Sequence, residues 1–131
     1  CDVTSFAEHL ARGSLPRLTT LRCVRVDHDI SSLFDALAKG ALPNIVELEL
    51  GFNQIGDADV SSLASACARG ALANCTVIDL SDNQIGDAGV SSLATACASG
   101  ALPKCTLVWL FGNPGSSEAV DKVLGERKKK V

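Results

Sequence analysis

The chain repeats itself with a period of 30 residues, and this repeat restricts its fold more than any other feature. Residues 41–70 (ALPNIVELELGFNQIGDADVSSLASACARG) and 71–100 (ALANCTVIDLSDNQIGDAGVSSLATACASG) are identical at 19 of 30 positions. Less exact copies fill the rest of the chain: 1–13, the second half of a unit; 14–40, shorter by three residues; and 101–131, a last copy that diverges. A unit of this length cannot bury its own apolar side, so we predict one domain over residues 1–131, built from stacked units.

Each unit carries the pattern of one short strand followed by one helix. Apolar and polar residues alternate over residues 76–80, which predicts a strand. Further along, apolar residues recur at steps of three and four, which predicts a helix with one buried face. That face consists of Val90, Leu93, Ala94 and Cys97. We expect Gly86 to form a tight turn, Asp87 to cap the start of the helix, and Gly100 to end it in a left-handed conformation.

The spacing of these residues resembles the leucine-rich repeat family, in its longer, ribonuclease-inhibitor-like type with a helix in every repeat. The residues that carry the resemblance are Leu48, Leu50, Asn53, Ile55 and Gly56, and their copies Ile78, Leu80, Asn83, Ile85 and Gly86. The resemblance covers nearly the whole chain. It implies an α/β fold: a right-handed leucine-rich-repeat solenoid with short parallel strands on the concave face and one helix per repeat on the convex face.

The resemblance also implies a role for the asparagines that follow the strands. Asn53, Asn83 and Asn113 would form a ladder of side-chain amides that satisfies backbone groups where the chain leaves each strand. The first copy has no asparagine at this step, so we expect the ladder to start at Asn53. The last copy has Gly115 where the earlier copies have a core isoleucine, so we expect an irregular loop there.

The two ends of the chain differ. Val120, Val123 and Leu124 fall on one face of a predicted helix, with charged residues elsewhere, which is typical of a C-terminal cap. Residues 1–13 are half a repeat with apolar residues at core positions, so no N-terminal cap is predicted. We therefore expect the chain to be part of a longer protein or of a larger complex.

The six cysteines do not form a recognisable metal or disulfide motif. No C-x-x-C occurs, and five of the six align with aliphatic core positions in other repeats: Cys23, Cys67, Cys75, Cys97 and Cys105. Buried free cysteine behaves as a small hydrophobe, so we expect reduced thiols and a cytosolic or similarly reducing compartment, with the organelle left open. Oxidation of Cys75 with Cys105, in adjacent repeats, is the alternative.

The remaining chemical candidates are few. Asp27, His28 and Asp29 could bind a metal or hold a general base, but no second ligand cluster accompanies them, so a polar turn is the simpler interpretation. The net charge of −3 does not favour nucleic acid, and no apolar run approaches the ~20 residues that span a bilayer. No phosphate-binding loop, dinucleotide motif or nucleophile elbow occurs. We therefore expect no enzyme, no metal and no cofactor.

Function in a repeat array is expected where the copies differ. In each predicted strand, the residues between the core positions point to the concave face. Along the repeats these positions change from basic through acidic to apolar, and they include the only tryptophan. The predicted partner-binding residues are Arg22, Arg25, Glu47, Glu49, Phe52, Val77, Asp79, Asp82, Leu107, Trp109 and Phe111. The alternative is that the C-terminal loop GNPGSSE covers Trp109 and Phe111.

A tryptophan beside apolar residues and rimmed by charge is typical of a protein-binding hot spot. We therefore expect a non-enzymatic interaction module or scaffold whose partner is a protein, with the carboxylates favouring a basic partner surface. Two alternatives stay open. One is a structural subunit that stabilises a large multiprotein assembly. The other is a GTPase-activating leucine-rich-repeat regulator, for which Arg25 is the only candidate residue.

Overall fold

The computed structural model describes residues 18–23, 30–40 and 42–129, and every structural statement below concerns these residues. Strands and helices alternate along them, as the repeat pattern predicts. The elements are β1 (Thr20–Arg22), α2 (Ser31–Ala38), β2 (Glu47–Glu49), α3 (Asp57–Ala68), β3 (Val77–Asp79), α4 (Asp87–Ala98), β4 (Leu107–Trp109) and α5 (Glu118–Lys129). From β2 onward, each strand and the helix that follows it form one unit of the repeat.

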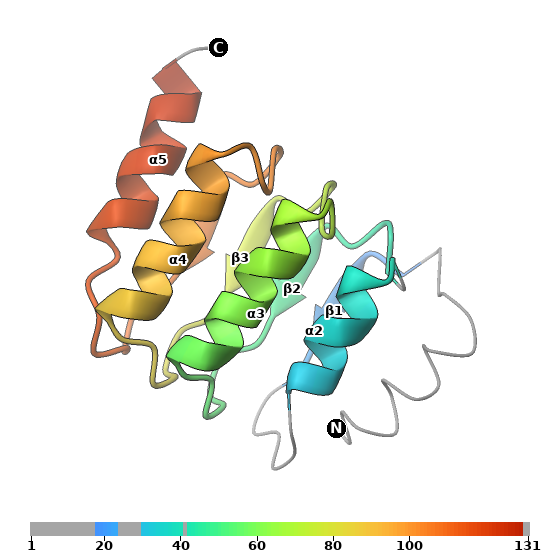
Figure 1. The fold of residues 1–131 in the computed structure, drawn as a ribbon, viewed down its shortest axis with the longest axis horizontal. Helices are drawn as coiled ribbons and strands as arrows, with labels where there is room; N and C mark the ends of the chain where they lie inside the picture. Colours follow the sequence, from blue (N-terminus) through green and yellow to red (C-terminus); the bar gives the residue numbers. More distant parts are fainter. Residues whose placement is uncertain (1–17, 24–29, 41, 130–131) are drawn as a thin grey trace.

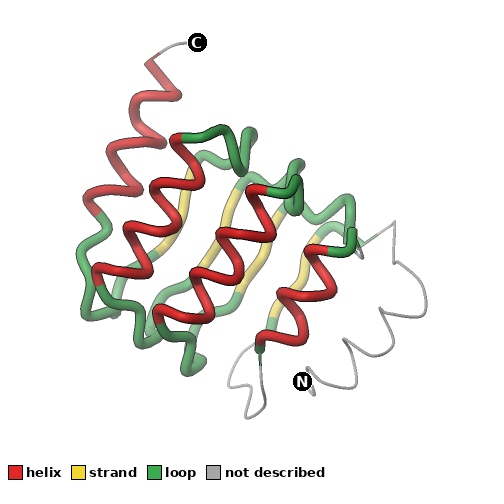
Figure 2. The backbone as a smooth tube through the Cα atoms, in the orientation of Figure 1, coloured by secondary structure: helices red, strands yellow, loops and turns green. Residues whose placement is uncertain are grey.

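The elements form two layers. The four strands make one parallel sheet in the order β1-β2-β3-β4, so chain neighbours are also neighbours in space. The helices α2, α3, α4 and α5 lie side by side in the same order and cover one face of the sheet (Figure 1). The tube view shows the strands behind this single layer of helices, so none of the described helices covers the other face of the sheet (Figure 2). The predicted α/β repeat solenoid is confirmed.

The core lies between the sheet and the helices. The central residue of every strand is buried while its neighbours point the other way: these central residues are Leu21, Leu48, Ile78 and Val108. On the helix side, Val90 and Leu93 of α4 are buried as predicted, and Val60 and Leu63 of α3 occupy the same places one repeat earlier. Full burial of one such side chain is worth about 1.5–3 kcal/mol, so contacts between neighbouring repeats supply the stability that a single repeat lacks.

The predicted asparagine ladder is present and binds each repeat to the one before it. The amide nitrogen of Asn83 donates to the carbonyls of Leu50 at 3.0 Å and Leu80 at 2.9 Å. Its oxygen accepts from the backbone N–H groups of Asn53 and Ile55, both at 3.1 Å. Each asparagine thus replaces the hydrogen bonds that the backbone would otherwise lose where it leaves the sheet.

Asn53 and Asn113 make the same contacts at either end of the ladder. The amide nitrogen of Asn53 donates to the carbonyl of Cys23 at 2.9 Å. The amide nitrogen of Asn113 donates to the carbonyl of Leu80 at 2.9 Å, and its oxygen accepts from the N–H of Ile85 at 3.0 Å. Among the described residues Asn53 is the first member of the ladder, and its predicted start stays a prediction because residues 24–29 lie outside the described ranges.

The prediction for the start of the helices was wrong in detail. Gly86, not Asp87, is the N-cap of α4, and it has an extended backbone (φ −93°, ψ −173°) rather than a tight turn. Asp87 is the first helical residue, and its carboxylate accepts from the N–H of Ser116 in the next repeat at 2.9 Å. Asp57 does the same one repeat earlier, accepting from the N–H of Gly86 at 2.7 Å. The aspartates therefore link repeats instead of capping their own helices.

The ends of the helices follow the prediction. Gly70 and Gly100 both have φ +105°, in the left-handed region that favours glycine. After α3, the N–H of Gly70 donates to the carbonyl of Cys67 at 3.0 Å, and the N–H of Ala71 donates to that of Ala66 at 3.1 Å. This pair of bonds is a Schellman motif, which satisfies carbonyls that the helix leaves open.

The last loop departs from the repeat, as expected from Gly115. The N–H of Gly115 donates to the carbonyl of Ile85 at 2.9 Å, a separation of 30 residues. The corresponding bond one repeat earlier joins Gln84 to Ile55, a separation of 29. A Cβ atom on Gly115 would lie 2.5 Å from the carbonyl carbon of Gly86, so only glycine fits at this contact. Beyond this loop, Val120 and Leu124 of α5 are buried against the core, which confirms the predicted face of that helix.

The described cysteines are core residues. Cys23, Cys67, Cys75, Cys97 and Cys105 are all buried, and no disulfide joins Cys75 to Cys105. Burial, with smaller contributions from Cys97, Cys75 and Cys105, raises the pKa of the Cys67 thiol from 9.0 to about 12. Burial also raises the pKa of Cys75 to about 12, which makes both thiols poor nucleophiles near neutral pH. The compartment stays a prediction.

Some predictions fall on residues outside the described ranges. These are the half repeat 1–13, the motif at Asp27, His28 and Asp29, and Arg25. The division into units 14–40, 41–70, 71–100 and 101–131 also stays a prediction. Among the described residues, no helix is both long enough and apolar enough to cross a membrane.

Candidate protein-binding site

The face of the sheet that carries no helix presents two rows of side chains, one from each end of the strands. The parallel register places Thr20, Glu47, Val77 and Leu107 in the first row, each beside the next. It places Arg22, Glu49, Asp79 and Trp109 in the second row. Both rows match the arrangement predicted from the sequence. Together with Phe52, Asp82 and Phe111, which follow the strands, these rows are called the strand face below.

The apolar end of the strand face is open to solvent. Trp109 is 50% exposed and Phe111 is 79% exposed, so the alternative that the C-terminal loop covers them is wrong. Leu107 is half-buried beside them. The backbone here is held firmly, since the carbonyl of Trp109 accepts from the N–H of Leu80 and that of Phe111 accepts from the N–H of Asp82, both at 2.8 Å. Two large aromatic side chains therefore project from a fixed strand into water.

Phe52 is a third exposed aromatic residue, with 56% of its surface accessible. It follows β2 and has φ +57°, which is a left-handed backbone conformation. For a residue with a large side chain this conformation is unfavourable by about 1–3 kcal/mol. The corresponding positions in later repeats hold Asp82 (φ +54°) and Gly112 (φ +81°). Phe52 lies two strands away from Gly112, so it borders the carboxylates rather than joining the Trp109–Phe111 pair.

The acidic residues of the strand face differ in how far they are neutralised. Glu49 pairs with Arg22, whose Nε lies 3.5 Å from its Oε2. Asp79 Oδ1 accepts from the N–H of Ser81 at 2.9 Å and from its hydroxyl at 2.6 Å. Within the described residues, the Arg22–Glu49 contact is the one ion pair found, so Glu47, Asp79 and Asp82 have no cationic partner. The middle of the strand face therefore carries uncompensated negative charge beside an exposed aromatic pair.

The described residues show little sign of a chemical site. No three histidine, cysteine, aspartate or glutamate side chains among them lie in a group that could hold a metal ion. The carboxylates of the strand face are spread along neighbouring strands, and the cysteines are on the opposite, buried side of the sheet. The arrangement offers charge and apolar surface for contact with another molecule.

Comparisons with known proteins agree with this fold. A family model described as "Leucine Rich repeat" matches residues 41–64 and 74–94, which contain β2, β3 and the first part of the helix after each. These two segments are similar to leucine-rich repeats. No curated protein matches the sequence. A solved structure that is similar to the chain is Leiomodin-1 Actin-Binding Site 2 (ABS2), with a TM-score of 0.70 and 12% sequence identity over 95% of this chain and 88% of that one.

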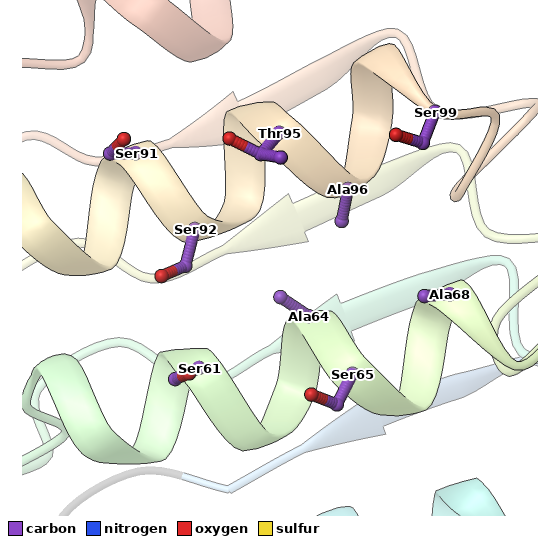
Figure 3. A pocket seen from close by; sticks show the side chains of 9 residues that line it. All are labelled: Ser61, Ala64, Ser65, Ala68, Ser91, Ser92, Thr95, Ala96 and Ser99. Atoms are coloured by element: carbon purple, nitrogen blue, oxygen red, sulfur yellow. The ribbon is translucent and has the colours of Figure 1, made fainter.

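The solenoid also has a groove that the sequence analysis missed. It runs between α3 and α4 on the helix side and has a volume of 440 Å³. Serine, alanine and threonine line it: Ser61, Ala64, Ser65, Ala68, Ser91, Ser92, Thr95, Ala96 and Ser99. Figure 3 shows Ala64 of α3 and Ser92 and Ala96 of α4 pointing into the gap between the two helices. The repeated small residues, read as helix positions, were the signal that could have predicted this groove.

The strand face and this helix groove lie on opposite sides of the solenoid. The structure brings together the predicted residues Val77, Asp79, Leu107, Trp109 and Phe111 on β3, β4 and the residues just after them. It places the Arg22–Glu49 pair at the other end of the sheet. The strand face thus has an aromatic end and a charge-paired end.

Proposed function

We propose that this leucine-rich-repeat domain is a non-enzymatic protein-interaction module that binds a protein partner on its strand face. The observation that supports this most strongly is the exposure of Trp109, in β4, and Phe111, just after it, on a segment whose carbonyls at both residues accept hydrogen bonds from the neighbouring repeat. Large apolar side chains that stay in water on a rigid surface are typical of interaction sites. Uncompensated carboxylates next to them favour a partner with a basic surface.

The energy available from the aromatic pair fits a hot spot. A tryptophan or phenylalanine side chain buries about 150–250 Å² when covered, at about 25 cal/mol per Å². With half of Trp109 and most of Phe111 still accessible, a partner that covers both would gain roughly 2–4 kcal/mol from each. Replacing an interface residue of this kind with alanine often causes a large loss of binding free energy. The two side chains therefore supply enough apolar surface to anchor a partner.

Several finer points belong to the same proposal. The repeats are of the ribonuclease-inhibitor-like type, since α3 and α4 give each of the two best-preserved repeats a helix of 12 residues. The domain works within a larger complex, in a reducing compartment. Leiomodin-1 Actin-Binding Site 2 is named as an actin-binding site, so a domain with this fold can bind a protein. The identity of the partner here is a separate question.

Affinity capture from cells of the source organism tests the proposal. The tagged wild-type domain is compared with a Trp109→Ala, Phe111→Ala double variant, which should lose partners by tenfold or more. A Ser65→Arg, Thr95→Arg variant is the matched control, because it changes two exposed residues of the helix groove and leaves the strand face intact. Circular dichroism confirms that each variant is folded.

Which variant loses its captured partners distinguishes the three candidate functions. Loss of partners in the aromatic variant alone supports the strand face as the binding site. Equal capture by wild type and the aromatic variant, together with loss in the helix-groove variant, contradicts the proposal and favours a structural subunit held through its helices. Acceleration of GTP hydrolysis by a captured partner, lost in an Arg25→Ala variant, would favour the GTPase-activating alternative instead.

A further inference from the structure

We infer that Asp79 and Trp109 together form a receptor for an arginine side chain of the partner. This inference rests on the proposed function, because it specifies the chemistry of a segment that docks on the strand face. It concerns the boundary where the acidic residues of β3 meet the aromatic end of β4. No other place on the described surface sets a carboxylate beside an exposed indole.

The two side chains are direct neighbours. Asp79 and Trp109 are Cα partners in the parallel register of β3 and β4, so their backbones lie about 4.8 Å apart. Residues paired in this way project from the same face of the sheet. The adjoining central pair, Ile78 and Val108, is buried on the opposite side, which fixes the direction of both.

The carboxylate of Asp79 is held in place for a donor. Its Oδ1 accepts two hydrogen bonds from Ser81, at 2.9 Å from the backbone nitrogen and 2.6 Å from the hydroxyl. Gly51 of the preceding repeat leaves room for this arrangement, since a Cβ atom there would lie 3.2 Å from the Ser81 hydroxyl and 3.5 Å from Asp79 Oδ1. Within the described part of the chain, Oδ2 has no hydrogen-bond partner. A fixed carboxylate with one free oxygen loses little entropy when a cation binds.

Trp109 supplies the second half of the receptor. Its side chain is half exposed, and an indole is the aromatic ring that attracts cations most strongly. A guanidinium is planar, so it can stack on the indole and still direct N–H groups at a carboxylate beside the ring. A lysine ammonium is a compact, strongly hydrated charge and gains less from stacking. The pair therefore selects arginine over lysine.

The surroundings favour a cation at this place and not elsewhere on the sheet. Glu49 is already paired with Arg22, so the charge-paired end attracts a second cation only weakly. Asp82 lies in the loop after β3 and Glu47 lies beside Val77 on β2, and neither has a cationic partner among the described residues. Leu107 and Phe111 lie on either side of Trp109 along the chain, and the carbonyl of Phe111 accepts from the N–H of Asp82 at 2.8 Å. A partner segment with an arginine between two apolar residues would place the arginine on Asp79 and Trp109 and its apolar neighbours near Leu107 and Phe111.

Fluorescence of Trp109, the only tryptophan in the chain, reports binding directly. The probes are acetylated, amidated pentapeptides Gly-Leu-Xaa-Leu-Gly, in which Xaa is arginine, lysine, glutamate or citrulline, a neutral isostere of arginine. They are titrated up to about 10 mM, where even a millimolar site fills. We expect the arginine peptide to bind about fivefold more tightly than the citrulline peptide and about twofold more tightly than the lysine peptide.

Two variants assign the preference to residues. Asp79→Asn should remove the difference between the arginine and citrulline peptides, while Glu49→Gln, the matched control one strand away, should keep it. Circular dichroism checks both for folding. Added salt should weaken the arginine peptide more than the citrulline peptide.

The outcomes keep this inference separate from the proposed function. Equal affinity for arginine and citrulline peptides, a preference for lysine, or no change in Trp109 fluorescence with any peptide would each overturn the arginine receptor. None of these results affects the capture experiment with the Trp109→Ala, Phe111→Ala variant. Failure of that capture experiment would contradict the strand face as the docking surface, whatever the peptides show.

Discussion

Asn83→Ala should be among the most destabilising substitutions in this domain, although the residue is polar. Asn83 is 7% exposed and makes five hydrogen bonds, three of them to the preceding repeat. Its loss removes one partner each from the N–H groups of Asn53 and Ile55 and from the carbonyls of Leu50, Leu80 and Ser81. At about 1 kcal/mol for each bond, the free energy of unfolding should fall by about 4–5 kcal/mol. That is a large fraction of the roughly 5–15 kcal/mol that stabilises a typical domain.

Equilibrium unfolding in urea, followed by circular dichroism, measures this loss. With a slope of about 2 kcal/mol per molar, the midpoint should fall by about 2 M. Asn74→Ala is the matched control. The amide of Asn74 contacts only the carbonyl of Pro43 at 3.3 Å and the amine of Lys104 at 2.9 Å, both in exposed settings. Its loss should cost less than about 1 kcal/mol. Equal costs for the two variants would refute the idea that the buried amide ladder joins the repeats.

Three further predictions rest on single contacts. Gly112→Ala should destabilise the domain by about 1–3 kcal/mol, because φ is +81° and the new Cβ would collide with the Asp82 carboxylate. Gly125→Ala, inside α5 with open space around it, should instead stabilise the domain by about 0.5–1 kcal/mol. The urea midpoints of the two variants measure both effects. Because folding raises the pKa of Cys67 from 9.0 to about 12, this thiol alone should lower stability by about 1.4 kcal/mol per pH unit above pH 9, where only the unfolded thiol ionises. Cys75 should add a similar decline, so Cys67→Ala should make the fall of stability with pH less steep without abolishing it. Glu49→Gln should cost less than about 1 kcal/mol in thermal unfolding, because its ion pair with Arg22 is solvent-accessible.

Much of this molecule could be predicted from the repeat alone. The positions that recur every 30 residues became the core and the asparagine ladder, because stacked units impose the same environment on each copy. Strand alternation likewise placed Glu49, Asp79 and Trp109 in one row. These features depend on local periodicity, which a sequence shows directly.

The features that the sequence did not predict depend on contacts between repeats. Asp87 has the character of a helix cap, but the backbone of the next repeat offers the N–H of Ser116 in a better position. The helix groove arises from small residues on α3 facing small residues on α4, and neither helix shows it alone. Whether the C-terminal loop covers Trp109 depended on the path of that loop, which the divergent last repeat did not reveal.

Site-specific photo-cross-linking tests the central claim, that the strand face is the docking surface, most directly. p-Benzoylphenylalanine replaces Phe111 in one variant and Ser65, in the helix groove, in another. The account predicts that irradiation with a captured partner joins it to the chain at position 111 and not at position 65. Cross-links from position 65 with none from position 111 would contradict it.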